Sequence, residues 1–197
     1  MKYLLISILL IFYLNIYSQN SKYVLWYYPS NVNNVYGVMI TVSPDYSDSI
    51  RCQPKVHGIE LDLTPEELLL SGFTFAYLFY KPFYEVDIKT INNVNLKTVN
   101  GVRIGFTDME ESIINGINLS LGDNLASKTN GLTISMLRRK NQNCNGVGVS
   151  LIANLDNSCN GIQIGLINKC SDLKGFQFGL WNKNQKRSLP IINWSFN

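Results

Sequence analysis

The chain has 197 residues, a net charge of +3, and 16% charged residues, which is low against the roughly 25% of ordinary soluble domains. Loss of Lys2 with an N-terminal leader would leave 3 − 1 = +2, a charge too weak to indicate nucleic-acid binding. The remaining length suits one domain with its own core.

The N-terminal residues predict a secretory signal peptide. Lys2 precedes an apolar run from Leu4 to Leu14, and the small residue Ser18 precedes Gln19. A transmembrane helix needs roughly 20 apolar residues, so this run suits a signal sequence better than a retained membrane anchor, which is the alternative. We therefore expect a signal peptide over residues 1–18, an exported protein, and a single β-repeat domain over residues 19–197.

One short helix is expected near residues 65–70. Thr64 can cap its N-terminus, Pro65 suits its first turn, and Glu67 completes a capping box. Three leucines follow, and the helix would end near Gly72. We expect this helix to be inserted between two strands.

The second half of the chain consists of a repeat of about 15 residues. Its copies align on glycines 101, 116, 131, 146, 161 and 175, and weaker copies surround Gly37, Gly58 and Gly72. The first, third and fifth residues after each glycine are apolar, whereas the second and fourth are mostly small or polar. This period of two predicts β-strands with one apolar face. The polar runs between copies predict turns, and the Asn-Gly pairs suit a backbone with positive φ.

Two all-β architectures fit the repeat. In a parallel β-solenoid each repeat is one coil, but such a coil is expected to bury apolar side chains around its circumference, and residues 138–143 are charged or polar. In an antiparallel meander each repeat is one strand and one turn. We therefore expect a repeat-built meander of roughly 10–12 strands that closes into an outer-membrane-type β-barrel, with the parallel β-solenoid as the alternative.

The faces of the strands can be assigned under the barrel hypothesis. The apolar residues would point outward to lipid, and the inner face would carry Gln, Ser, Thr and Gly together with charged residues. The charged residues assigned to this inner face are Glu60, Asp62, Asp87, Lys89, Lys97 and Arg103. Substitution Ile164→Arg is then expected to impair assembly far more than Gln163→Arg.

The four cysteines, residues 52, 144, 159 and 170, distinguish the two architectures. Cys144 and Cys159 occupy equivalent repeat positions, which stack about 4.8 Å apart in a solenoid but lie over 20 Å apart in a meander. The barrel therefore predicts no bond between Cys144 and Cys159 and permits an approach of Cys144 to Cys170. No Cys-x-x-Cys pair occurs and His57 is the only histidine, so a zinc site is not expected.

The copies GIQIGLIN from Gly161 and GFQFGLWN from Gly175 resemble a family of bacterial surface-repeat proteins whose repeat is Gly-Leu-x-Ile-Gly-Leu-x-Asn. The ending from Lys186 to Trp194 is similar to theirs as well. The resemblance covers roughly residues 100–197, and Glu60, Asp62 and Arg103 depart from the small residues that the family favours. It implies export and a cell-envelope location, and it implies no reaction.

No catalytic, cofactor-binding or metal-binding residues are assigned. The pairs Glu60/Asp62 and Asp87/Lys89 are interpreted as solvent- or lumen-facing, and His57 as a turn residue. The repeated serines 120, 135 and 150 lack a nucleophile-elbow motif, and the tyrosines, which include Tyr27, Tyr28, Tyr77, Tyr80 and Tyr84, suit an interfacial girdle or core packing.

The expected function is that of a non-catalytic protein of the bacterial cell envelope. As an outer-membrane β-barrel it would be structural or related to transport, with membrane lipid as its partner. The alternative is a secreted β-repeat module for binding or adhesion, which would recognise a surface ligand through a strand face or its turns. No cofactor and no nucleic acid are expected in either case.

Overall fold

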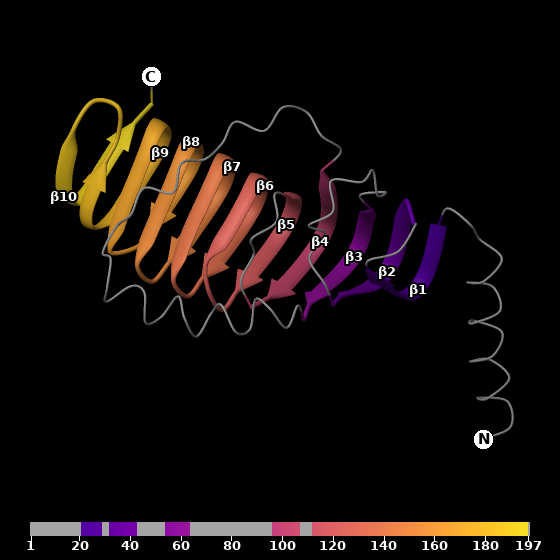
Figure 1. The fold of residues 1–197 in the computed structure, drawn as a ribbon. Coiled ribbons are helices and arrows are strands. Elements are labelled where there is room, and N and C mark those ends of the chain that lie inside the picture. The colour runs from indigo at the N-terminus through magenta and orange to yellow at the C-terminus, as the bar shows by residue number, and fades with distance from the viewer. Residues whose placement is uncertain (1–20, 29–31, 43–53, 64–95, 107–111, 197) are drawn as a thin grey trace, which may run out of the picture.

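The computed structural model describes residues 21–28, 32–42, 54–63, 96–106 and 112–196. These residues form a single ten-stranded sheet whose strands lie side by side in chain order (Figure 1). The strands are β1 (Ser21–Tyr28), β2 (Asn34–Thr41), β3 (Lys55–Asp62), β4 (Lys97–Gly105), β5 (Ser112–Ser120), β6 (Asn124–Ser135), β7 (Arg138–Ser150), β8 (Ala153–Ile164), β9 (Ile167–Lys183) and β10 (Ser188–Ser195).

The strands from β1 to β9 all run in the same direction, each parallel to the next. Only β10 is antiparallel, to β9. The chain must therefore return to its starting side between successive strands, so each repeat is one coil of a β-solenoid. The expected antiparallel barrel is therefore wrong, and the location in the cell envelope stays a prediction.

A column of glycines marks one corner of every coil. Eight glycines, numbered 37, 58, 101, 116, 131, 146, 161 and 175, are Cα partners from coil to coil and have φ between 129° and 148°. A Cβ on Gly161 would lie 1.9 Å from the carbonyl oxygen of Gly146, so no larger residue fits there. The expectation of positive φ at the Asn-Gly pairs is confirmed, and the weaker copies at Gly37 and Gly58 are true repeats.

The interior of the solenoid is largely polar. The second and fourth residues after the corner glycines point inward, and from β6 to β9 so do the residues seven and five positions before them, which include Arg139 and Asn141. The buried polar residues after the corner glycines are Thr41, Glu60, Asp62, Arg103, Asn118, Ser120, Thr133, Ser135, Ser150, Gln163 and Gln177. The charged run over residues 138–143 therefore fits inside a coil, because every second side chain enters a polar core rather than an apolar one.

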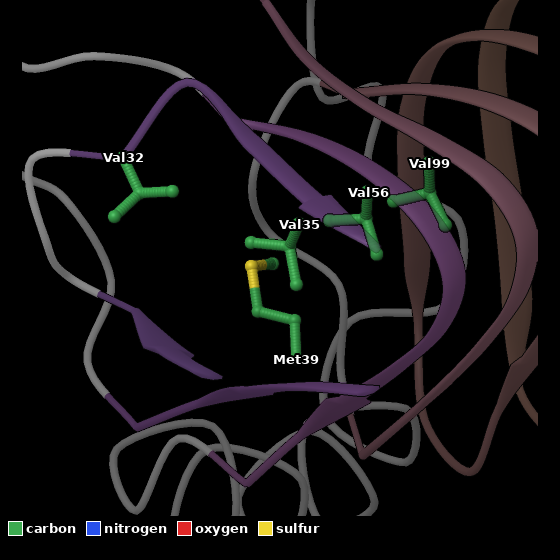
Figure 2. Close-up of a cluster of buried hydrophobic side chains, with 5 residues drawn as sticks. All are labelled: Val32, Val35, Met39, Val56 and Val99. Carbon is green, nitrogen blue, oxygen red and sulfur yellow. The ribbon is translucent and has the colours of Figure 1, made fainter. Parts of the chain in front are cut away.

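Apolar packing is confined mainly to one inner column, two residues before the corner glycines. Its members are Val35, Val56, Val99, Ile114, Thr129, Cys144, Cys159 and Leu173. At the N-terminal end this column packs with Val32 and Met39, as Figure 2 shows. The remaining stabilisation of the interior must come from hydrogen bonds and ion pairs, which are worth most when fully satisfied.

The C-terminal strand covers the last coil. Asn193 of β10 lies opposite Gln177 of β9 and donates to its Oε1 at 3.1 Å, which continues the polar interior. Asn184 and Arg187 hold the turn before β10, because both donate to the carbonyl oxygen of Trp194. The far edge of β9 is thereby paired rather than exposed.

Several expectations lie outside the described residues. They are the signal peptide over residues 1–18, the helix near 65–70, the weak copy at Gly72, the pair Asp87/Lys89, Cys52, and Tyr77, Tyr80 and Tyr84. No helix long and apolar enough to cross a bilayer is present among the residues that the structure describes.

Candidate functional site

One outer surface of the solenoid is entirely apolar. The first, third and fifth residues after each of the eight corner glycines point outward, which gives 8 × 3 = 24 positions, and every one is Val, Ile, Leu, Met or Phe. None of these side chains is buried, and Ile104, Ile134 and Ile164 are 39–42% exposed. We call this surface the apolar face. It confirms the predicted outward direction of the apolar residues, although the sheet encloses a packed interior and not a wide lumen.

The strands at both ends of the sheet extend the apolar face. Leu25 and Tyr27 of β1 lie in register with its first two columns and are about half exposed. In β10, Ile192 lies opposite Phe178 and Trp194 lies opposite Phe176. The ring of Phe196 packs edge-on against Phe176 with 5.1 Å between ring centroids. The face therefore runs across all ten strands.

From β6 to β9 the other arm of the coils has a mainly polar outer surface. In β7 and β8 its outward residues include Lys140, Asn143, Asn157 and Ser158, beside Leu155. Asparagines at the corner between the two arms form a hydrogen-bonded column, in which Asn115 donates to Asn100 at 2.7 Å and Asn130 donates to Asn115 at 2.6 Å. The arm that carries the apolar face is therefore apolar on its outside, whereas the other arm presents polar side chains to water.

Charge is distributed unevenly between the interior and the surface. Among the described acidic residues, Glu60, Asp62 and Asp156 are buried inside the solenoid, and Asp123 is engaged by Arg138. The exposed described cations are Lys55, Lys128, Lys174, Lys183, Lys186 and Arg187, against Asp172 as the exposed acid. The described surface is therefore positively charged, most densely near β9 and β10.

An ion-pair cluster fills the interior of β3 and β4. Lys97 Nζ lies 2.9 Å from Glu60 Oε1, and Arg103 Nη2 donates to Asp62 Oδ2 at 2.6 Å. Thr41 adds a hydrogen bond to Glu60 at 2.8 Å. Burial alone would raise the pKa of Glu60, but the charges of Lys97 and Arg103 hold it below its usual value. The inward direction of these four charged residues is confirmed, but the expectation that Glu60 and Asp62 face solvent or a lumen is wrong, because both are buried and paired. This pairing makes the cluster structural.

A second buried cluster joins β7 and β8. Arg139 Nη1 donates to Cys144 Sγ at 3.1 Å, Arg139 Nη2 contacts Asp156 Oδ2, and Cys159 is the Cα partner of Cys144. Gln163 Nε2 also donates to Asp156, at 2.6 Å. We call Arg139, Cys144, Asp156 and Cys159 the thiol cluster. Sequence reasoning missed it, although all four residues occupy inward positions of two consecutive repeats.

The two thiols of this cluster differ in acidity. A hydrogen bond from Cys159 and the charge of Arg139 lower the pKa of Cys144 to about 5, against the opposing effect of burial. The same hydrogen bond and burial raise the pKa of Cys159. Burial also raises the pKa of Asp156 to about 7, although Arg139 opposes this shift. The guanidinium of Arg139, 3.1 Å from Cys144 Sγ, therefore favours the thiolate form at Cys144 rather than at Cys159.

The thiol cluster also offers metal-ligand atoms. The sulfurs of Cys144 and Cys159 and a carboxylate oxygen of Asp156 lie within 4.8 Å of one another. The guanidinium of Arg139, however, already contacts both Cys144 and Asp156 and supplies the positive charge that these groups require. The residues present therefore fit an ion-paired thiolate better than a cation site.

His57, the repeated serines and Cys170, which the sequence analysis also considered, make contacts typical of a structural role. His57 stacks on Tyr36 with 4.8 Å between ring centroids, and Asn100 lies 3.5 Å from its Nδ1. Serines 120, 135 and 150 form one buried column of the interior. Cys144 and Cys159 are Cα partners, as the solenoid alternative requires and the meander excludes, whereas Cys170 is the Cα partner of Asp156.

Comparisons of the chain with protein-family models, with curated proteins and with solved structures find no match. The resemblance to surface-repeat proteins therefore stays a prediction.

Proposed function

We propose that this chain is an exported, non-catalytic β-solenoid that binds a lipid surface of the cell envelope through its apolar face. The main observation in support of this proposal is that all 24 outward positions of the apolar face are apolar and none of them is buried. Large exposed apolar patches of this kind mark interaction sites in soluble proteins.

The size of the face supports an interaction role. Nine steps between ten strands at about 4.8 Å, and five residues at about 3.3 Å, give roughly 43 Å by 16 Å, or about 700 Å². The largest apolar patch of an ordinary monomer is about 300–600 Å². An uncovered surface above that range favours a permanent apolar partner.

The chemistry of the face favours lipid over a protein partner. Protein interfaces of standard size carry about ten hydrogen bonds, and their energetic centres are rich in Trp, Tyr and Arg. The three columns contain no polar side chain that could fix the register of a partner. Acyl chains need no such register, because their attraction scales with buried apolar area.

The charge of the described surface supports anionic lipid. Lys183, Lys186 and Arg187 are exposed beside the aromatic end of the face, and Arg187 lies over the ring of Trp194 at 4.3 Å. Trp and cationic side chains together suit the headgroup level of a bilayer. Each cation near an anionic membrane adds about 1 kcal/mol of attraction.

The test is co-sedimentation of the protein with phosphatidylcholine vesicles that contain phosphatidylglycerol. The variant Ile134→Glu/Ile164→Glu places two charges in the middle of the apolar face, and we expect it to bind at least about tenfold more weakly. The control Asn143→Glu/Asn157→Glu adds the same charges to the polar arm and should retain nearly all binding.

Two outcomes would contradict the proposal. Equal vesicle binding by both double variants would show that the apolar face is not the lipid-binding surface. A dimer in lipid-free buffer that only Ile134→Glu/Ile164→Glu dissociates, in analytical ultracentrifugation, would assign the face to a second copy of the chain.

A further inference from the structure

The two thiols of the thiol cluster are in register on adjacent strands. Cys144 of β7 and Cys159 of β8 are Cα partners, and both lie two residues before a corner glycine. Parallel strands lie about 4.8 Å apart, which is within the range of about 4.4–6.8 Å that a disulfide allows between Cα atoms. Both side chains are buried in the same column.

The third described cysteine is out of register with this pair. Cys159 is the Cα partner of Leu173, three residues beyond Cys170 along β9. Cys170 packs in the same buried cluster, with its Sγ 3.8 Å from the carbonyl oxygen of Asn157, but its own Cα partner is Asp156 and not a cysteine. Cys144 and Cys159 are thus the one matched pair among the described cysteines.

The surroundings of the pair favour thiol–disulfide exchange. The attacking species in such exchange is a thiolate, and nearby cations stabilise it. Arg139 Nη1 lies 3.1 Å from Cys144 Sγ, whereas Cys170 lacks a cation at this distance within the described chain and has a pKa that burial raises to about 12. Cys144 is therefore the nucleophile and Cys159 the residue that completes the bond.

We propose that Cys144 and Cys159 are the site of an inter-coil disulfide, formed by exchange with a small-molecule disulfide such as oxidised glutathione. The Cys144 thiolate attacks one sulfur, the glutathione S–S bond breaks, and one glutathione thiolate leaves. The Cys159 thiol then gives its proton to that thiolate and attacks the sulfur of Cys144, which releases the second glutathione as a thiolate that takes a proton from water. Two protein thiols are oxidised and one glutathione disulfide is reduced to two thiols.

This inference does not depend on lipid binding. A covalent bond between β7 and β8 would join two consecutive coils near the middle of both strands. Disulfides persist in oxidising compartments outside the cytosol, which suits a chain expected to be exported.

The experiment incubates the full folded chain with oxidised glutathione and maps its disulfides by mass spectrometry. Trypsin places Cys144 and Cys159 in one peptide, residues 141–169, and Cys170 in the next. An internal bond makes that peptide lighter by the mass of two hydrogen atoms. Cleavage before Asp156 then leaves two fragments that separate only after reduction.

Variants that lack single cysteines test whether the register of β7 and β8 determines which disulfide forms. We expect the 144–159 link to be the main product in the native chain and in Cys170→Ser, and to disappear in Cys159→Ser. The same reaction in denaturant should give mixed pairings that include Cys52. A folded chain in which Cys144 links mainly to Cys170 or Cys52, or in which no link forms, would overturn the inference.

Discussion

Asn154 in β8 donates a hydrogen bond from Nδ2 to Oδ1 of Asn168 in β9 at 2.8 Å, and neither side chain is exposed. Asn168 in turn donates to Asn182 Oδ1 at 2.7 Å and to the carbonyl oxygen of Phe178 at 2.9 Å. A column of amides thus replaces part of an apolar core. Such a network stabilises only while each member keeps its partners, because an unpaired buried polar group costs the full desolvation penalty.

Substitution Asn168→Leu should therefore destabilise the fold although leucine is apolar and of similar size. It leaves Asn182 Oδ1 without its donor and removes the bonds of Asn168 to the carbonyl oxygens of Gly165 and Phe178, and each group left unpaired costs about 1–3 kcal/mol. We expect a loss of at least about 2 kcal/mol in urea unfolding. Asn145→Leu on the exposed corner column is the control and should cost less than about 1 kcal/mol. A smaller loss for Asn168→Leu than for Asn145→Leu would contradict a polar core.

Arginine substitutions on the two faces of β8 are expected to differ strongly in their effect on stability. Gln163 is buried, and it hydrogen-bonds Asp156 and accepts a bond from Gln177, whereas neighbouring Ile164 is 42% exposed. Gln163→Arg must force a longer, charged side chain into a filled interior, which should cost about 3 kcal/mol or more. Ile164→Arg should cost less than about 1 kcal/mol of stability in lipid-free buffer, as a surface substitution does.

This order reverses the one expected for a barrel. The measurement is the urea midpoint of each variant beside the unmodified chain, with circular dichroism to show that both retain β-structure. If Ile164→Arg proves the more damaging of the two without lipid, the assignment of the solenoid faces is wrong.

The sequence contains the repeat register and the direction of each side chain, but not the direction of each strand. A period of two is the same in parallel and antiparallel sheets, so the pattern around Ile162 and Gln163 fits both. The choice of a meander depended on the premise that a solenoid core must be apolar. Arg139 and Asn141, which seemed to exclude a coil, are instead buried partners of Asn154 and Asp156.

The thiol cluster could have been found by aligning the columns. Arg139 and Asn154 both lie seven residues before a corner glycine, and Cys144 and Cys159 both lie two before one. Stacking these positions at the spacing of parallel strands brings Cys144 beside Cys159 and Arg139 beside Asn154. The contact of Arg139 with Asp156 was not predictable in this way, because it crosses between two columns of the interior.

Substitution of a corner glycine by alanine tests how closely consecutive coils pack. A Cβ on Gly146 would lie 2.1 Å from the carbonyl oxygen of Gly131, and its φ of 134° is strained for any L-residue with a side chain. Backbone atoms cannot move aside cheaply, so Gly146→Ala should cost about 3 kcal/mol or more, or prevent folding. Gly105→Ala is the matched control, since its Cβ would meet the Asp62 side chain at 3.1 Å. Equal unfolding midpoints for the two variants would exclude a glycine corner at residue 146.

The buried pair of Glu60 and Lys97 predicts a specific loss of stability in acid. The folded-state pKa of Glu60 lies below its value of about 4.5, because Lys97 and Arg103 outweigh the effect of burial. A depressed carboxyl pKa contributes stability that is present above the unfolded-state pKa and is lost as pH falls through the folded-state pKa. The unfolding free energy of the native chain should therefore fall steeply below about pH 4.5.

The variant Glu60→Gln isolates this contribution from those of other carboxyl groups. At neutral pH it removes the buried ion pair with Lys97 and should cost about 3–5 kcal/mol. Below about pH 4.5, however, its stability should change less than that of the native chain, so the two curves converge in acid. Urea unfolding of both proteins across this range makes the comparison, with Asp172→Asn at an exposed carboxyl as the control. Curves for native protein and Glu60→Gln that stay parallel down to pH 3 would show that Glu60 is not the ionised centre of this cluster.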